Sequence, residues 1–153
     1  MKGFTLIELI TVILILGIVS VFAVPRLSGS EAFSVIGARD AGLSVARQVQ
    51  LRAMQQEDPS NRCNALFVTA TRMGGSNNTD CQWQDDRSDV VDLSETDVRI
   101  KTTTTIFFDL LGRPRTNKGV RRCASKECKF TFFEGSSTAS ICLNSEGYFY
   151  ACD

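Results

Sequence analysis

The stretch that decides the fold is the N-terminal sequence MKGFTLIELITVILILGIVSVFAV, residues 1–24. From Leu6 to Val24 it is almost wholly apolar, and with a rise of about 1.5 Å per residue it is long enough to cross a bilayer as a helix. One carboxylate, Glu8, interrupts it near its start. An ionised side chain inside hydrocarbon costs at least about 2.5–3.5 kcal/mol, so such a residue normally has a partner. The nearest candidate cation is the terminal amine that a cut before Phe4 would create.

The segment Gly3-Phe4-Thr5-Leu6-Ile7-Glu8-Leu9 resembles the class III signal of type IV prepilins and pseudopilins. The resemblance implies cleavage between Gly3 and Phe4 by a prepilin peptidase, followed by N-methylation of the Phe4 amine. It also implies that Glu8 is an assembly residue, which pairs with the amine of a neighbouring subunit, and that Pro25 lies where many family members bend the first helix. The leader before Gly3 is shorter than usual, which leaves an upstream start site open. The alternative is a plain single-pass anchor with an unrelated glutamate.

Composition narrows the class of protein. The chain has 153 residues, so the apolar segment leaves room for one small domain after it. Its 17 basic and 17 acidic residues balance, which implies no bulk polyelectrolyte partner. Histidine is absent, which argues against a hydrolase or a zinc site because the commonest general base and metal ligand is missing. Six cysteines favour an exported domain in an oxidising compartment over a cytosolic enzyme.

Beyond the apolar run, the sequence predicts a more polar helix that ends near residue 58. Pro25 and Gly29 favour a bend between the two helical halves. Pro59 ends the second half, because proline disfavours helical geometry in the residue before it. Apolar or small residues recur every three or four positions, which predicts one buried stripe with polar side chains elsewhere on the helix. The stripe comprises Val35, Ala38, Gly42, Val45, Val49 and Ala53.

The predicted fold is α+β, a long N-terminal helix, half transmembrane and half amphipathic, packed on an antiparallel β-sheet. Its divisions are a leader at 1–3, a transmembrane and assembly helix at 4–25, an amphipathic helix at 26–58 and a disulfide-rich β head at 59–153. Strand signals occur at 65–71, at 98–101 and 104–108 as a strand or hairpin pair, at 129–133, and at 139–143 with 148–152 as a hairpin. Alternation places Phe130 and Phe132 on one face of their strand.

The head carries a second, weaker resemblance. Ile106-Phe107-Phe108-Asp109 followed by Leu111-Gly112-Arg113-Pro114, with a later Glu146-Gly147-Tyr148, resembles minor pilins of the mannose-sensitive haemagglutinin pilus system. It is also similar to the minor pilins and pseudopilins of the GspH/FimT type. The likeness covers about half of the head and implies the type IV pilin-like architecture given above.

The cysteines are disulfide candidates, and six of them allow fifteen pairings, among which sequence cannot select. They are Cys63, Cys81, Cys123, Cys128, Cys142 and Cys152. Cys123 and Cys128 bracket four residues and could face each other across a hairpin, while Cys63 and Cys81 could close a loop-rich segment. Cys142 and Cys152 would then pair with each other, but a hairpin turn with a bulge at Gly147 sets Cys142 opposite Tyr150. Cys152 then lies on a diagonal of about 7–8 Å, so the terminus would have to curl. A metal cluster is disfavoured because no Cys-x-x-Cys pair occurs.

The chain also carries one acidic and one basic cluster. The acidic run 80–97 could bind calcium, but the EF-hand spacing is absent and acidic loops are usually only solvated. The basic run could contact DNA phosphates, although aromatic residues do not interleave with it. The alternatives are a solvated loop or a charge complement to the acidic segment of an adjacent subunit. The possible DNA contacts are Arg113, Arg115, Lys118, Arg121 and Arg122.

The sequence therefore predicts a non-enzymatic structural subunit, a type IV minor pilin concerned with assembly, adhesion or surface attachment, with no cofactor or metal. Its expected partners are other pilin subunits, the prepilin peptidase and the inner-membrane assembly machinery. Its expected location is the inner membrane, as a single-pass protein with a periplasmic head, and then the extracellular pilus. The alternatives are a type II secretion pseudopilin and a DNA-binding minor pilin for uptake.

Overall fold

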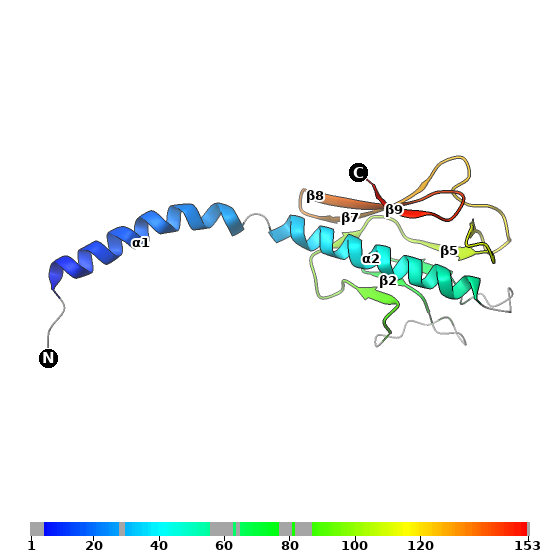
Figure 1. The fold of residues 1–153 in the computed structure, drawn as a ribbon, viewed down its shortest axis with the longest axis horizontal. Coiled ribbons are helices and arrows are strands. Elements are labelled where there is room, and N and C mark those ends of the chain that lie inside the picture. The colour runs from blue at the N-terminus through cyan, green and yellow to red at the C-terminus, as the bar shows by residue number, and fades with distance from the viewer. Residues whose placement is uncertain are drawn as a thin grey trace.

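The computed structural model describes residues 5–27, 30–55, 63, 65–76, 81 and 87–152, with residues 21–27 and 30 described by their backbone alone. Helix α1 (Leu6–Leu27) extends away from a head in which helix α2 (Ser30–Met54) lies against antiparallel β-sheets (Figure 1). This α+β, pilin-like architecture confirms the predicted fold class.

The head contains two antiparallel sheets where the sequence predicted one. One sheet has the strand order β3-β2-β1-β5-β6, and the other has the order β4-β7-β8-β9. The strands are β1 (Ala65–Val68), β2 (Arg72–Gly74), β3 (Val90–Asp92), β4 (Arg99–Ile100), β5 (Thr104–Phe108), β6 (Pro114–Arg115), β7 (Cys128–Glu134), β8 (Ser137–Leu143) and β9 (Phe149–Cys152).

The core lies between α2 and both sheets. All six residues of the predicted stripe, Val35 through Ala53, are buried, and Ala46 joins them. Gly42 marks the closest approach, because a Cβ there would lie 2.7 Å from Cζ of Phe132. The helix can therefore pack against the sheet only while this position has no side chain.

The opposite face of α2 is less polar than the sequence analysis predicted. Phe33 is 80% exposed, and Leu51 and Ile36 are exposed as well. These side chains lie away from the core, so α2 carries a second set of apolar residues that its own sheets do not cover.

The strand predictions are confirmed in part. Phe130 and Phe132 are both buried on the core face of β7. The hairpin of β8 and β9 has the predicted register, with Cys142 opposite Tyr150. Segments 98–101 and 104–108 do not pair with each other, because β4 pairs with β7 in one sheet and β5 pairs with β1 in the other.

Three disulfides stabilise the head, and they resolve the pairing that the sequence left open. Cys63 bonds Cys81 with 4.7 Å between Cα atoms, Cys123 bonds Cys128 at 5.2 Å, and Cys142 bonds Cys152 at 5.8 Å. The last distance is shorter than the regular diagonal of about 7–8 Å, so the end of β9 does come closer to β8 than a flat ladder would allow.

Candidate assembly site

The candidate site begins where α1 begins, with a pair of reciprocal hydrogen bonds between Thr5 and Glu8. The Thr5 backbone N–H donates to Oε2 of Glu8 at 3.3 Å, and the Glu8 N–H donates to Oγ1 of Thr5 at 3.4 Å. The Thr5 hydroxyl also donates to the same Oε2, at 3.2 Å. This arrangement is a capping box, which satisfies free N–H groups at the first turn of a helix. The Glu8 carboxylate therefore has a partner within its own chain.

The capping box leaves acceptor capacity on Glu8. Its hydrogen bonds end on Oε2, and among the described residues none ends on Oε1. A carboxylate can accept about four hydrogen bonds, so a further donor could bind without displacing Thr5. The sequence analysis missed Thr5, although the pattern Thr5-Leu6-Ile7-Glu8 is the sequence signature of a capping box.

The side chains of α1 that follow Glu8 form a continuous apolar surface. Every described side chain from Thr5 to Ser20 is exposed, including Leu6 at 77% and Leu16 at 62%. Large exposed apolar surfaces mark sites of contact with another protein or with lipid, because water solvates them poorly. Over the described residues, no helix combines the length and hydropathy that a membrane span requires.

Three predicted residues of this site are described only in part or not at all. Gly3 and Phe4, the predicted cleavage and methylation positions, lie outside the described residues. Pro25 is described by its backbone, which is helical within α1. Residues 28–29, between the end of α1 and the start of α2, also lie outside the described residues, so the predicted bend at Pro25 stays a prediction.

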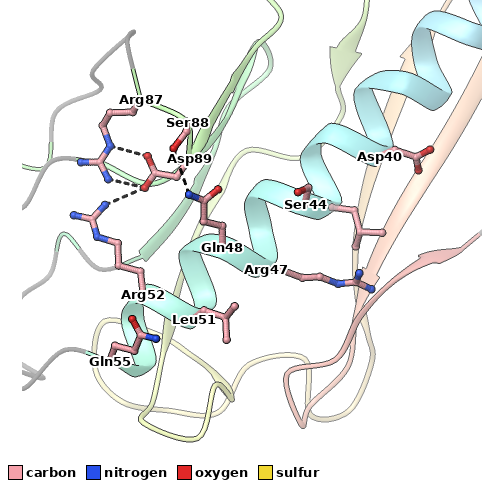
Figure 2. Close-up of a pocket in the computed structure, with 11 residues that line it drawn as sticks. Asp40, Ser44, Arg47, Gln48, Leu51, Arg52, Gln55, Arg87, Ser88 and Asp89 are labelled. Carbon is pink, nitrogen blue, oxygen red and sulfur yellow. Dashed lines mark hydrogen bonds and ion pairs between the residues drawn. The ribbon is translucent and has the colours of Figure 1, made fainter.

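A groove runs along the outer face of α2 near its C-terminal end, between the helix and residues 87–89 (Figure 2). Asp89 is one of the residues that line it and is buried, with a side chain that is 6% exposed. Its carboxylate pairs with Arg52 at 2.9 Å and with Arg87 at 2.6 Å. A buried charge is stable only when it is paired and hydrogen-bonded, so these two arginines explain how Asp89 is accommodated.

The acidic run 80–97 is therefore used in part for structure. Asp92 pairs with Arg72 at 2.8 Å, much as Asp89 pairs with its two arginines. Within the described ranges, no group of three or more His, Cys, Asp and Glu side chains is placed to hold a metal ion. Asp85 and Asp86, which the calcium alternative also invoked, lie outside those ranges.

The end of the head farthest from α1 is built from two turns joined by one side chain. Nε2 of Gln50 donates to the carbonyl oxygens of Gly112 and Gly147, each at 2.7 Å. Gly147 has φ +93° and packs so closely on the other turn that a Cβ there would lie 2.2 Å from the Gly112 oxygen. Only glycine adopts this φ without strain and also allows this approach. The turns at 109–113 and 144–148 thus form one rigid unit with the last turns of α2.

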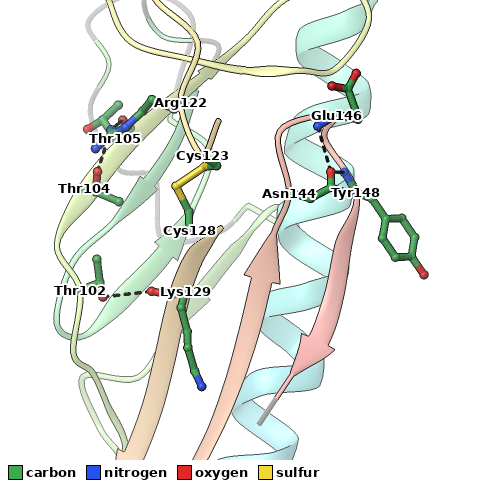
Figure 3. Close-up of a disulfide and its surroundings, with 10 residues drawn as sticks. All are labelled: Thr102, Thr104, Thr105, Arg122, Cys123, Cys128, Lys129, Asn144, Glu146 and Tyr148. Carbon is green, nitrogen blue, oxygen red and sulfur yellow. Dashed lines mark hydrogen bonds between the residues drawn. A yellow bond between two sulfur atoms is a disulfide. The ribbon is translucent and has the colours of Figure 1, made fainter. Parts of the chain in front are cut away.

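Four of the five predicted DNA-contacting residues have partners inside the head. Arg113 and Arg121 share the carboxylate of Glu146, at 3.2 and 2.7 Å, and Arg115 pairs with Asp109 at 2.7 Å. The guanidinium of Arg122 donates to Oγ1 of Thr104 and to the carbonyl of Thr105, beside the Cys123–Cys128 disulfide (Figure 3). Lys118 is exposed.

Asp109 organises the first of the two turns, and its pKa reflects this role. Partial burial acts to raise the pKa of its carboxyl, but hydrogen bonds from the Arg115 guanidinium and from the N–H groups of Arg113 and Leu111 outweigh it. The pKa therefore lies below its ordinary value of about 3.9. A carboxyl group whose pKa is lower in the folded than in the unfolded chain stabilises the fold. This stabilisation is complete at pH values above the unfolded-state pKa and is lost as the pH falls through the folded-state pKa.

We expect Asp109→Asn to reduce the loss of stability in acid. Between about pH 5 and about pH 2.5 the wild-type chain should lose more free energy of unfolding than the variant, because only the wild type has this carboxylate to protonate. Guanidinium unfolding at the two pH values measures the difference. Asp40→Asn is the matched control, since Asp40 is 58% exposed and pairs only with the adjacent Arg39 in the described structure. Equal acid sensitivity of wild type and Asp109→Asn would contradict the expectation.

The N-terminal end of this site is similar in sequence to a known protein motif. Residues 1–24 match the prokaryotic N-terminal methylation motif. No curated protein and no solved structure matches the chain. Type IV pilins and pseudopilins are structural, non-enzymatic proteins that a prepilin peptidase processes, and they are anchored in the inner membrane before assembly. The exposed apolar surface of α1 and the capped Glu8 are part of the matched region. This chain carries, at residues 1–24, the class III signal typical of type IV pilins and pseudopilins.

Proposed function

We propose that the chain is a minor structural subunit of a type IV pilus, which is held in the inner membrane with its head in the periplasm and then assembled into the extracellular filament. The observation that carries this proposal is the exposed apolar surface of α1, which begins at the matched motif and contains the single carboxylate Glu8. A folded head does not need such a helix. Its apolar side chains become buried only when α1 lies in lipid or against the helices of other subunits.

Assembly then follows from the position of Glu8. Cleavage after Gly3 would produce a new amine at Phe4, and methylation would leave that amine able to carry a positive charge. In a bundle of α1 helices the dielectric constant is low, so the amine of one subunit and the Glu8 carboxylate of another attract strongly. Oε1 of Glu8, on which no hydrogen bond from a described residue ends, is the acceptor available for this pair, while Oε2 keeps its bonds to Thr5.

The head supplies shape rather than chemistry in this proposal. Its three disulfides suit the oxidising periplasm and the cell exterior, where the filament would work. The likeness of the head to minor pilins of the mannose-sensitive haemagglutinin system and of the GspH/FimT type stays a prediction, because no curated protein or solved structure matches. A type II secretion pseudopilin has the same N-terminal motif, and it differs in building a filament that stays in the periplasm.

We expect Gly3→Val to block maturation. The peptidase must approach the backbone at Gly3 closely, and a β-branched side chain hinders that approach. Full-length precursor should accumulate in the inner membrane, with cleavage reduced by about tenfold or more. Intact-mass measurement of the membrane fraction reads the mass of the leader directly. Gly17→Val is the matched control, because a Cβ at Gly17 in α1 meets nothing within 4 Å. Normal maturation of Gly3→Val would mean that the leader is wrongly assigned.

Sheared surface filaments then distinguish the pilus from the alternatives. If the chain is a minor pilin, mature protein should appear in sheared pili. Its recovery only in the periplasmic and membrane fractions would favour a secretion pseudopilin. A DNA-uptake role makes a separate prediction, which is salt-dependent DNA binding that Lys118→Glu weakens.

A further inference from the structure

The turns at the far end of the head present apolar side chains to solvent. Leu110 is 61% exposed, Leu111 is 65% exposed, and Val120 and Tyr148 are each 62% exposed. We call these four residues, with the basic side chains of Lys118 and Arg121, the distal crest. Several exposed large apolar side chains at one end of a head are typical of a contact surface.

The distal crest is rigid, which suits a binding surface. Oδ1 of Asp109 accepts hydrogen bonds from the N–H of Leu111 at 3.0 Å and from the N–H of Arg113 at 2.9 Å, so it fixes the turn that carries both leucines. Gln50 then ties that turn to α2 and to the turn before Tyr148. A preorganised surface loses little conformational entropy on binding.

The distal crest also carries an excess of positive charge. Among the described residues around it, five basic side chains, Arg113, Arg115, Lys118, Arg121 and Arg122, outnumber the carboxylates that pair with them, those of Asp109 and Glu146. Two of the arginines share the one carboxylate of Glu146. A partner surface should therefore be acidic, with some apolar area.

The opposite end of the same head carries such a surface. Glu31 lies in the first turn of α2, at the end of the head nearest α1. A Cβ at Gly135 would lie 2.9 Å from Oε2 of Glu31, so the turn between β7 and β8, which contains Gly135, is at the same end. Arg99 is opposite Phe133 in the ladder, which places the loop before β4, with its exposed Glu95 and Asp97, at this end as well.

We call the four carboxylates at this end, those of Glu31, Glu95, Asp97 and Glu134, the proximal rim. Among the described residues none of the four forms an ion pair, and Oε2 of Glu134 is buried without a hydrogen-bond partner there. Arg99, the basic residue beside them, donates instead to the carbonyl oxygens of Leu93, Thr96 and Val98. Phe133, which is 37% exposed, adds apolar area.

We propose that the distal crest of one copy of this chain docks on the proximal rim of a second copy. The two surfaces have opposite charge and both contain apolar side chains, and they lie at opposite ends of one rigid head. A contact between different ends of the same molecule is heterologous, so each added copy offers the same free surface again, and the contact builds a filament where its rotation does not close a ring. This inference rests on the proposed function, because a filament of α1 helices would set such heads one above another. Docking of the distal crest on DNA or on an anionic membrane would use only its positive charge and not its apolar side chains.

Zero-length carbodiimide cross-linking tests the contact, because it joins a lysine amine only to a carboxylate in direct contact with it. The full chain is expressed as a mixture of ¹⁴N and ¹⁵N copies, and both membrane and pilus fractions are treated. We expect cross-linked peptides of mixed label that join Lys118 to Glu95 or Asp97. A cross-link within one copy is excluded by distance, since the segment of α2 from Glu31 to Gln50 alone spans about 28 Å.

Charge exchange makes the test specific. Lys118→Glu combined with Arg121→Glu should lower cross-linking between copies and recovery in pili by about tenfold, because like charges then face each other across the contact. For these variants, glutaraldehyde replaces the carbodiimide as the cross-linker. Adding Glu95→Lys and Asp97→Lys to that chain should restore both. Lys129→Glu, a charge change on the outer surface of β7, is the matched control and should change neither.

The outcomes separate this inference from the proposed function. Mature protein in sheared pili without a cross-link from Lys118 to the proximal rim, in either fraction, overturns the docking and leaves the pilin proposal standing. Failure of the charge exchange to restore the contact overturns the docking as well. Cross-linking in the membrane fraction with no protein in any surface filament supports the docking and counts against the pilus.

Discussion

Glu8→Val is expected to leave synthesis, cleavage and membrane insertion intact while removing the subunit from sheared pili. Valine is apolar, so it should favour insertion of α1 rather than oppose it. In a helix bundle, however, the Phe4 amine of the neighbouring subunit would lose its anionic partner. Breaking a buried pair in this way costs about 3–5 kcal/mol, which corresponds to a loss of at least about a hundredfold in recovery from pili.

Glu8→Gln separates the charge of this residue from its capping role. Glutamine also completes a capping box, so it can keep the bonds to Thr5 while it carries no charge. If pairing with the amine drives assembly, Glu8→Gln should fail as Glu8→Val does. Asp40→Val, which removes an exposed acidic residue of α2 outside both proposed contact surfaces, is a control for general effects on helix stability. Equal recovery of Glu8→Val and wild-type protein in purified pili, both with the N-methyl group, would mean that Glu8 is not an assembly residue.

Gly147→Ala is expected to destabilise the head more than any other single methyl addition to its turns. An L-residue at φ +93° is strained, at a cost of about 1–2 kcal/mol. The added Cβ would also lie 2.2 Å from the Gly112 carbonyl oxygen, which is backbone and already holds a hydrogen bond from Gln50. Overpacking of this kind typically costs a further ~1–3 kcal/mol. The free energy of unfolding should therefore fall by roughly 2–5 kcal/mol in total. Guanidinium unfolding of the full chain in detergent measures it.

Gly119→Ala is the matched control for this experiment. Gly119 has φ +76°, and a Cβ there meets nothing within 4 Å. Its substitution should therefore show the conformational strain alone, about 1–2 kcal/mol. The difference between the two variants reports the contact between the two turns. Equal destabilisation by both would show that the turns can separate without cost, which would contradict the rigid far end of the head.

Much of the fold could be predicted from local pattern. The buried stripe of α2 and the hairpin of β8 and β9 follow from periodicity and turn chemistry, which depend on neighbours in sequence. The arrangement of segments 98–101 and 104–108 could not be predicted in this way. Both are short and β-rich, but the Lys101 N–H donates to the carbonyl of Thr131 rather than to the nearby second strand. The choice of sheet depends on residues about 30 positions away, which local pattern does not contain.

The candidate site shows the same limit. Glu8 and the apolar run were visible because an acidic residue among apolar ones is rare. The partners of the basic run could not be predicted from sequence, because Glu146 lies 25 residues beyond Arg121. Gln50 was missed for a different reason, since a polar residue near the end of a helix is ordinary in sequence. Its importance appears only when two turns place carbonyl oxygens against it.

The capping box at Thr5 and Glu8 has a consequence for the life cycle of the subunit. A carboxylate that was stable only in the filament would make assembly irreversible, because every returning subunit would carry an unsatisfied charge. Here Glu8 keeps its two donors from Thr5 in both states, so a subunit that leaves the filament loses the amine but still carries a hydrogen-bonded carboxylate. The cost of leaving, as far as Glu8 is concerned, is therefore limited to the loss of that one pair. Under the proposed function, subunits withdrawn from a filament would return to the membrane pool undamaged and ready for another round of assembly.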